Sequence, residues 1–114
     1  MRREITAGKL SKILKEHKRR YENADVGEKA DLSGADLIAA GLSGAYLYNA
    51  NLSGADLEDA NLSYADLTQV YNFCIKQLSE ARTLYKAKLD PELKKQVKDE
   101  YPHLLEEEEE EEEE

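Results

Sequence analysis

Leucine recurs every five residues along the middle of the chain, and alanine stands two positions before each leucine. The leucines of this series are Leu32, Leu37, Leu42, Leu47, Leu52, Leu57, Leu62 and Leu67. On an α-helix a step of five residues advances by about 140°, which would spread them around the whole circumference. On a straight strand they would alternate between the two faces of a sheet. A chain that bends once per unit turns every leucine toward one axis, so the pattern predicts a β-solenoid over residues 30–70.

The other positions of the repeat favour the same fold. The residue before each leucine and the residue two after it are mostly small or turn-forming, and Asp, Asn and Gly prevail there. Such residues suit the corners of a coil. Alanine as the second inward residue suits a narrow interior, which two large side chains per unit would overpack.

The unit A(D/N)Lxx, repeated eight times over residues 30–69, resembles that of the pentapeptide-repeat proteins, in particular small bacterial members with helical caps. The resemblance implies a right-handed, four-sided β-helix with four units to a coil, and therefore about two coils here. It also implies that the eight leucines form the structural core, stacked inside with the alanines. Gly41 and Tyr46 depart from the Asp or Asn that the family usually has before leucine.

Residues 1–29 are expected to form a capping helix and a loop. A helix from about residue 6 to residue 20, with Thr6 as its N-cap, would place the following side chains on one face: Leu10, Ile13, Leu14, His17 and Tyr21. A cap is needed because the end of a solenoid exposes an apolar layer. His17 has no second His or Cys nearby, so we expect a packed or hydrogen-bonded side chain rather than a metal ligand.

Residues 71–105 are expected to form a second cap of two helices. The first would span about 76–88, with an apolar stripe made of Leu78, Ala81, Leu84, Tyr85 and Leu89. The second would have Asp90 as its N-cap and Pro91 at its first position, and Pro102 would end it. We expect Cys74, which has no base beside it in the sequence, to be buried as a small hydrophobe.

The net charge of -9 comes from the last nine residues, which are all glutamate. Residues 106–114 bury nothing and are expected to form a disordered tail. Within the remaining neutral chain, residues 1–29 carry +4, residues 30–69 carry -6 and residues 70–105 carry +2. The acidic repeats therefore predict that no nucleic acid is bound.

Other features of the sequence limit the expected location of the protein and its class of function. No apolar run approaches the ~20 residues of a membrane span, so we expect no membrane partner. The basic N-terminus has no apolar segment behind it, and the single cysteine forms no internal disulfide, so we expect a cytoplasmic location. No nucleophile motif, metal-ligand spacing or phosphate loop is present, which predicts a protein without catalytic residues, cofactor or metal.

The sequence therefore favours a noncatalytic protein-protein interaction or scaffold module, whose partner is an unidentified protein or a second copy in a homodimer. The candidate binding face consists of Tyr46, Tyr48 and Tyr64, because residues 20 apart should stack and these rings then lie outward on one side of the coil. The competing interpretation is that a terminal helix covers this face. Exposure or protection of the three rings distinguishes the two.

A second function follows only from the resemblance. Some members of the family form long acidic rods that occupy the DNA site of topoisomerases, so the alternative is a DNA-mimic inhibitor of such an enzyme. The acidic repeats favour this alternative. Against it, two coils make a short rod at about 5 Å per coil, and the segments on either side of the repeats are basic.

Overall fold

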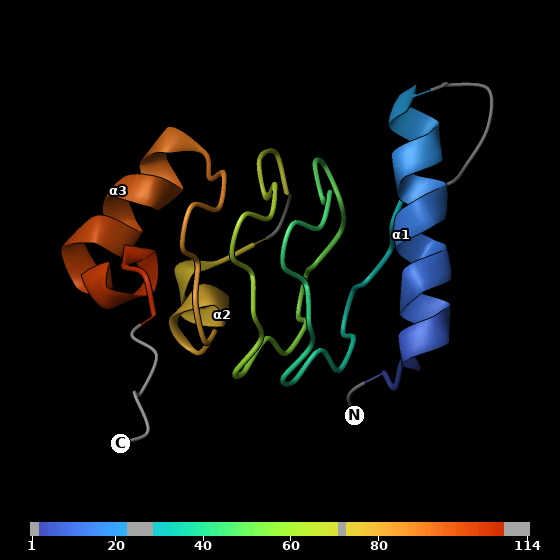
Figure 1. Ribbon diagram of the computed structural model, residues 1–114, viewed down its shortest axis with the longest axis horizontal. Helices are drawn as coiled ribbons and strands as arrows, with labels where there is room; N and C mark the ends of the chain where they lie inside the picture. The colour runs from blue at the N-terminus through green and yellow to red at the C-terminus, as the bar shows by residue number, and fades with distance from the viewer. Residues whose placement is uncertain (1–2, 23–28, 71–72, 109–114) are drawn as a thin grey trace, which may run out of the picture.

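A computed structural model describes residues 3–22, 29–70 and 73–108 (Figure 1). The elements are α1 (Ala7–Glu22), α2 (Ile75–Ser79), α3 (Pro91–Glu100) and the 3-10 helix η1 (Pro102–Leu105). The coiled repeats lie between α1 at one end and α3 at the other (Figure 1). The loop expected after α1 and the end of the glutamate tail lie outside the described residues.

The repeats stack through parallel bridges between residues that are 20 positions apart. The bridged pairs are Asp31 with Asn51, Asp36 with Asp56, Gly41 with Asn61, and Tyr46 with Asp66. A spacing of 20 residues is four units, so four units complete one coil and each side of a coil lies over the same side of the next. The bridges are isolated, and the described repeats contain no longer strands. The expected right-handed sense of the coil stays a prediction.

The interior of the coils holds the residues that the repeat pattern assigns to it. All eight leucines of the series are at most 2% exposed, and six of the preceding alanines are buried beside them. Successive coils are joined by backbone hydrogen bonds, such as the one that the Leu32 N–H donates to the Asn51 carbonyl at 2.8 Å. The backbone polar groups of one coil are thus paired with those of the next, as a buried core requires.

The corners explain the polar residues of the repeat. The fifth residue of each of the eight units has a positive φ between 57° and 71°, the region that glycine adopts without strain. The Asp or Asn before leucine accepts the backbone N–H two residues later, as Asp31 does from Ser33 at 3.1 Å. This short side-chain bond fixes the turn, which is why Asp and Asn recur at that position.

The N-terminal helix forms as predicted. Thr6 caps α1, because its hydroxyl oxygen accepts the Lys9 N–H at 3.1 Å. Before the helix, Arg3 bridges to Ala35 in parallel, donating to the Gly34 carbonyl at 2.8 Å and accepting the Asp36 N–H at 2.7 Å. The start of α1 is therefore tied to the second side of the first coil.

The helix predicted over 76–88 is wrong for most of its length. α2 ends at Ser79, and Thr83 and Lys88 then form parallel bridges to Asn61 and Asp66 of the second coil. The bridged residues are now 22 apart, because α2 occupies one side of this third, partial coil. Leu78, Leu84 and Leu89 are buried, but they extend the leucine stack instead of forming a helical stripe.

The last helix, α3, begins at Pro91 as predicted, but Asp90 does not cap it with its side chain. The Asp90 carboxylate instead accepts the Gln69 backbone N–H at 3.0 Å, which ties the start of α3 to a corner of the second coil. In η1, Leu104 is buried and its carbonyl accepts the Leu84 N–H at 2.7 Å. The end of the chain thus closes the third coil.

Cys74 is exposed, so the prediction that it is buried is wrong. The residue that turns inward nearby is Gln77 of α2. Its amide nitrogen donates to the carbonyls of Leu52 and Ala55, at 2.8 and 3.1 Å. This side chain satisfies backbone acceptors of the second coil at the side where α2 replaces a repeat unit.

The described helices include none that is long and apolar enough to cross a bilayer.

Candidate functional site

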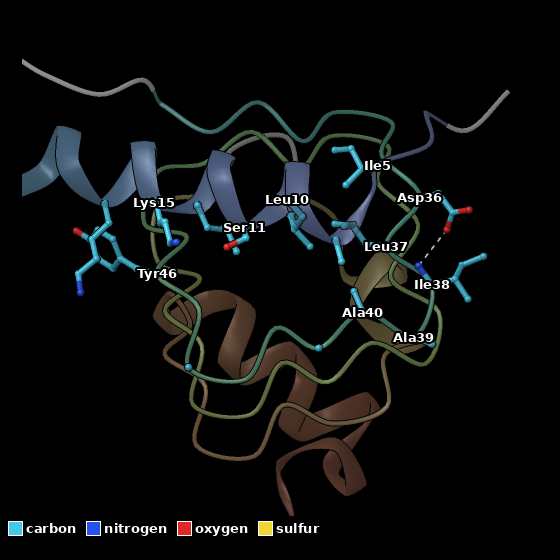
Figure 2. Close-up of a pocket in the computed structure, with 15 residues that line it drawn as sticks. Ile5, Leu10, Ser11, Lys15, Asp36, Leu37, Ile38, Ala39, Ala40 and Tyr46 are labelled. Atoms are coloured by element: carbon cyan, nitrogen blue, oxygen red, sulfur yellow. Dashed lines mark hydrogen bonds between the residues drawn. The ribbon is translucent and has the colours of Figure 1, made fainter.

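A groove of about 680 Å³ lies between α1 and the first coil (Figure 2). We name it the N-terminal groove and define it by its apolar lining, namely Ile5, Leu10, Leu14, Leu37, Ala40 and Tyr46. Figure 2 shows α1 along one wall and the backbone of the first coil along the other. The groove is therefore built from α1 and the first coil, which residues 23–28 join in the sequence.

Small residues on both walls create the space. On α1, Ala7 and Ser11 line the groove one helical turn apart. On the coil, Ala39, Gly41 and Gly44 line the opposite wall, and a Cβ atom built on either glycine meets nothing within 4 Å. Larger side chains at these corners would fill the groove.

His17 holds α1 against the first coil. Its side chain is fully buried, its Nδ1 accepts the Ala30 N–H at 2.9 Å, and its Nε2 lies 2.8 Å from the Tyr48 carbonyl oxygen. Because Nδ1 accepts a hydrogen bond, the proton is on Nε2, which donates to Tyr48, and the ring is neutral. Burial lowers the pKa of His17 below its usual 6.5, and the nearby charges of Lys29 and Arg20 lower this pKa further. The prediction of a hydrogen-bonded cap residue is confirmed.

Two of the three candidate tyrosines lie next to this anchor. The rings of Tyr46 and Tyr48 are stacked, with centroids 6.3 Å apart and planes at 13°. Tyr21 of α1 packs edge-on against both, at 5.9 and 5.3 Å, and its hydroxyl oxygen accepts a hydrogen bond from the Asn49 side chain at 3.0 Å. Tyr46 and Tyr48 are half-buried as a result. The helix that packs on these two rings is α1, at the N-terminal end of the solenoid.

Tyr64 has a different neighbour. It is 56% exposed and packs edge-on against Tyr85 of the third coil, at 5.7 Å. The three tyrosines are therefore divided between a cluster with Tyr21 and a pair with Tyr85. Their role as one protein-binding face stays a prediction.

The two ends of the N-terminal groove carry opposite charges. Figure 2 shows Lys15 and Tyr46 toward one end, and Asp36 and Ile38 toward the other. The Asp36 backbone is bonded to Arg3, just before α1, whereas Lys15 and Lys18 lie in the second half of the helix. At 1.5 Å per residue, about 12–16 Å of helix separates its start from these lysines. The groove thus combines an apolar floor with a cationic end and an anionic end.

Sequence reasoning placed Tyr21 on the inner face of the helix, but it missed the groove and the packing of Tyr21 against Tyr46 and Tyr48. The available signal was the helical spacing of His17 and Tyr21, four residues apart, which puts both rings on the face of α1 that meets the coil. The groove itself depends on where α1 crosses the end of the coil. That crossing is set by contacts between residues far apart in sequence, such as His17 and Tyr48.

The titratable groups of the groove do not form a catalytic arrangement within the described chain. Burial raises the pKa of Tyr46, and the charge of Asp66 raises it further, so the phenol is neutral at pH 7. Among the described residues, no group of three or more His, Cys, Asp or Glu side chains is arranged to hold a metal ion. What the site offers chemically is apolar contact, hydroxyl hydrogen bonding and charge.

The family model for pentapeptide repeats, in eight copies, matches residues 40–71. This segment contains half of the first coil and all of the second. The repeats are therefore pentapeptide repeats, and the resemblance of this segment to the pentapeptide-repeat proteins is confirmed. Such repeats generally form right-handed, four-sided β-helices, in keeping with the four-unit register described above. No curated protein and no solved structure matches the chain.

Proposed function

We propose that this protein is a noncatalytic protein-interaction module and that the N-terminal groove is its binding site. The observation that supports the proposal is an apolar groove left open beside a core that is already closed. Leu32, Leu42 and Leu47 of the first coil are at most 1% exposed, so the coil needs no further cover over its own leucines. The partly exposed side chains of the groove are then available to a partner.

The composition of the groove suits a protein partner better than a reacting small molecule. Ile38, at the rim, is 37% exposed, and Tyr46 offers a half-buried ring with a neutral hydroxyl group. Aromatic and aliphatic anchors of this kind, surrounded by charges, are typical of protein interfaces. Pentapeptide repeats are generally noncatalytic, which supports the same class of function.

The test is affinity capture from lysate with the full chain as bait and with two matched variants. Gly41→Arg adds a long side chain in the groove wall at a residue with ordinary φ and open space. Gly8→Arg adds the same side chain on α1, where a Cβ also meets nothing within 4 Å. We expect a protein to be retained by the wild type and by Gly8→Arg and to be lost from Gly41→Arg. Equal retention by all three folded baits would contradict the groove as the binding site.

DNA mimicry is the alternative function, and one feature supports it: Asp36 and Asp56 stack on one side of the coils. The third coil weighs against it, because Lys88 lies over Asp66 and places a positive charge on another side of the coils. Inhibition of a topoisomerase that survives truncation after Leu105 would favour mimicry. Inhibition that disappears with the glutamates would assign it to the tail.

A further inference from the structure

The charges of the N-terminal groove are arranged so that the groove complements itself. A two-fold rotation about its centre exchanges its two ends. Lys15 and Lys18 of one copy then lie opposite Asp36 of the other copy, and the same contact forms in reverse at the other end. Interfaces between identical subunits related by a two-fold axis require this self-complementarity, because each patch meets a copy of itself. An acidic or a basic groove of one sign would repel its own copy.

The groove-facing side of α1 suits close packing against another helix. Ala7, Ser11, Lys15 and Lys18 lie at spacings of three or four residues and line the groove together. The first two are small, so a second helix can approach closely near the middle of this face. The two lysines lie beyond that region, where their long side chains can reach across.

We propose that the occupant of the N-terminal groove is a second copy of this chain, packed about a two-fold axis with the two α1 helices antiparallel. The proposal rests on the proposed function, since it names the partner of the same site. Lys15 and Lys18 of each copy face Asp36 of the partner subunit. Ile38 of each copy covers the apolar wall near Tyr46 of the partner subunit. Ser11 lies midway between the charged ends and therefore close to the axis.

The other charges near these ends leave the polarity in place. At the cationic end, the charge of Asp66 acts on Tyr46, and the two lysines outnumber it. At the anionic end, the Asp36 carboxylate accepts the Ile38 N–H at 3.1 Å.

The backbone of Arg3 is hydrogen-bonded to that of Asp36. The Arg3 guanidinium group, however, contacts Asp31 at 3.8 Å and the Ser33 carbonyl at 3.3 Å. Lys18 shares an ion pair with Glu22 at 3.8 Å, with both side chains about two-thirds exposed. Exposed pairs of this kind contribute little and rearrange easily. Neither contact neutralises the polarity of the groove.

Sedimentation equilibrium of the full chain at physiological ionic strength tests the proposal. We expect a concentration-dependent dimer whose dissociation constant rises at least tenfold in Asp36→Lys, and likewise in the double variant Lys15→Glu/Lys18→Glu. Lysine is acceptable before the leucine of a coil side, because Lys88 precedes Leu89 in the third coil and bridges to Asp66 there. Combining all three changes swaps the two ends and should restore the dimer. Restoration also shows that the single variants failed for their charge rather than their fold.

A matched pair of cysteines tests the geometry in a Cys74→Ser background. Ser11→Cys, near the axis, should form an interchain disulfide under mild oxidation with oxidised glutathione. Lys12→Cys should not, because Lys12 lines a separate hollow with Lys9 and Lys29 on another face of α1. Equal cross-linking at both positions would overturn the antiparallel arrangement. A dimer insensitive to the charge variants would place the interface elsewhere and overturn the proposal.

The same experiments separate this inference from the proposed function. A chain that stays monomeric, but retains another protein through the groove, overturns the second copy as occupant and leaves the interaction module standing. A monomeric chain with no groove-dependent capture overturns both. A dimer broken by the charge variants and restored by the swap supports both.

Discussion

The His17 side chain occupies the place over Tyr48 where a preceding coil would supply a backbone hydrogen-bond donor. Its Nε2 is 2.8 Å from the Tyr48 carbonyl, across 31 residues of sequence. One coil further on, the equivalent carbonyl of Thr68 accepts the backbone N–H of Asn49 at 3.0 Å. The first coil has no such neighbour, so the imidazole supplies the missing donor and, through Nδ1, an acceptor for Ala30. The cap thus continues the hydrogen bonding of the solenoid with a side chain.

This arrangement predicts a loss of stability in acid. The pKa of His17 is lowered in the folded protein, so folded His17 binds a proton less readily than unfolded His17. The contribution of neutral His17 to the free energy of unfolding is therefore fully present above pH 6.5. It is lost as the pH falls from there through the pKa of His17 in the folded protein. We expect the free energy of unfolding, measured by urea denaturation, to fall between pH 7.5 and pH 5.

The variant His17→Gln isolates this effect from the titration of carboxylates. A glutamine amide offers both a donor and an acceptor but carries no charge. Its free energy of unfolding should change less between the two pH values than that of the wild type. His103→Gln, at an exposed histidine, should behave as the wild type does. An unchanged pH dependence in His17→Gln would rule out His17 as the cause.

Two glycines in one repeat unit should respond oppositely to alanine. Gly44 has a φ of +71°, a conformation that costs an alanine roughly 1–2 kcal/mol. Gly41 has an ordinary φ and open space around it, so Gly41→Ala should be neutral or stabilise by about 0.4–1 kcal/mol through the unfolded chain. Thermal or urea unfolding of both variants measures this difference. Equal changes in the free energy of unfolding would mean that the positive φ of Gly44 does not determine the cost of an alanine there.

Gln77 should be more important for stability than its position in a five-residue helix indicates. Replacing it by leucine leaves the carbonyls of Leu52 and Ala55 without this donor, at a cost of about 1–3 kcal/mol. Gln96→Leu, on the exposed part of α3, is the matched control and should change stability little. Urea denaturation of the two variants provides the measurement. Equal stability of the two would show that water replaces the Gln77 amide at no cost.

The sequence predicts most of this fold because the repeat signal is local. Every unit carries its own inward Ala and Leu and its own corner residues, so the coil can be inferred unit by unit. α1 and α3 were likewise indicated by residues at their own boundaries, Thr6 and Pro91. These features depend on neighbours within a few positions along the chain.

The third coil could not be read in the same way. Leu78, Leu84 and Leu89 fit both an amphipathic helix and a continued leucine stack, and Thr83 and Lys88 replace the usual Asp or Asn before leucine. The choice is made by pairing with Asn61 and Asp66, 22 residues earlier, which a local pattern does not contain. The N-terminal groove depends on long-range contacts in the same way.

Concentration-dependent amide spectra of the full chain give the most direct test of the groove as an interaction site. If a second copy occupies it, the amides of Ser11, Ala39 and Gly41 should shift as the protein concentration rises. Amides of α3, at the opposite end, should stay in place. The same shifts should vanish in Asp36→Lys. Shifts centred on α3 or on Tyr64 and Tyr85, with none beside α1, would contradict the groove as the interface.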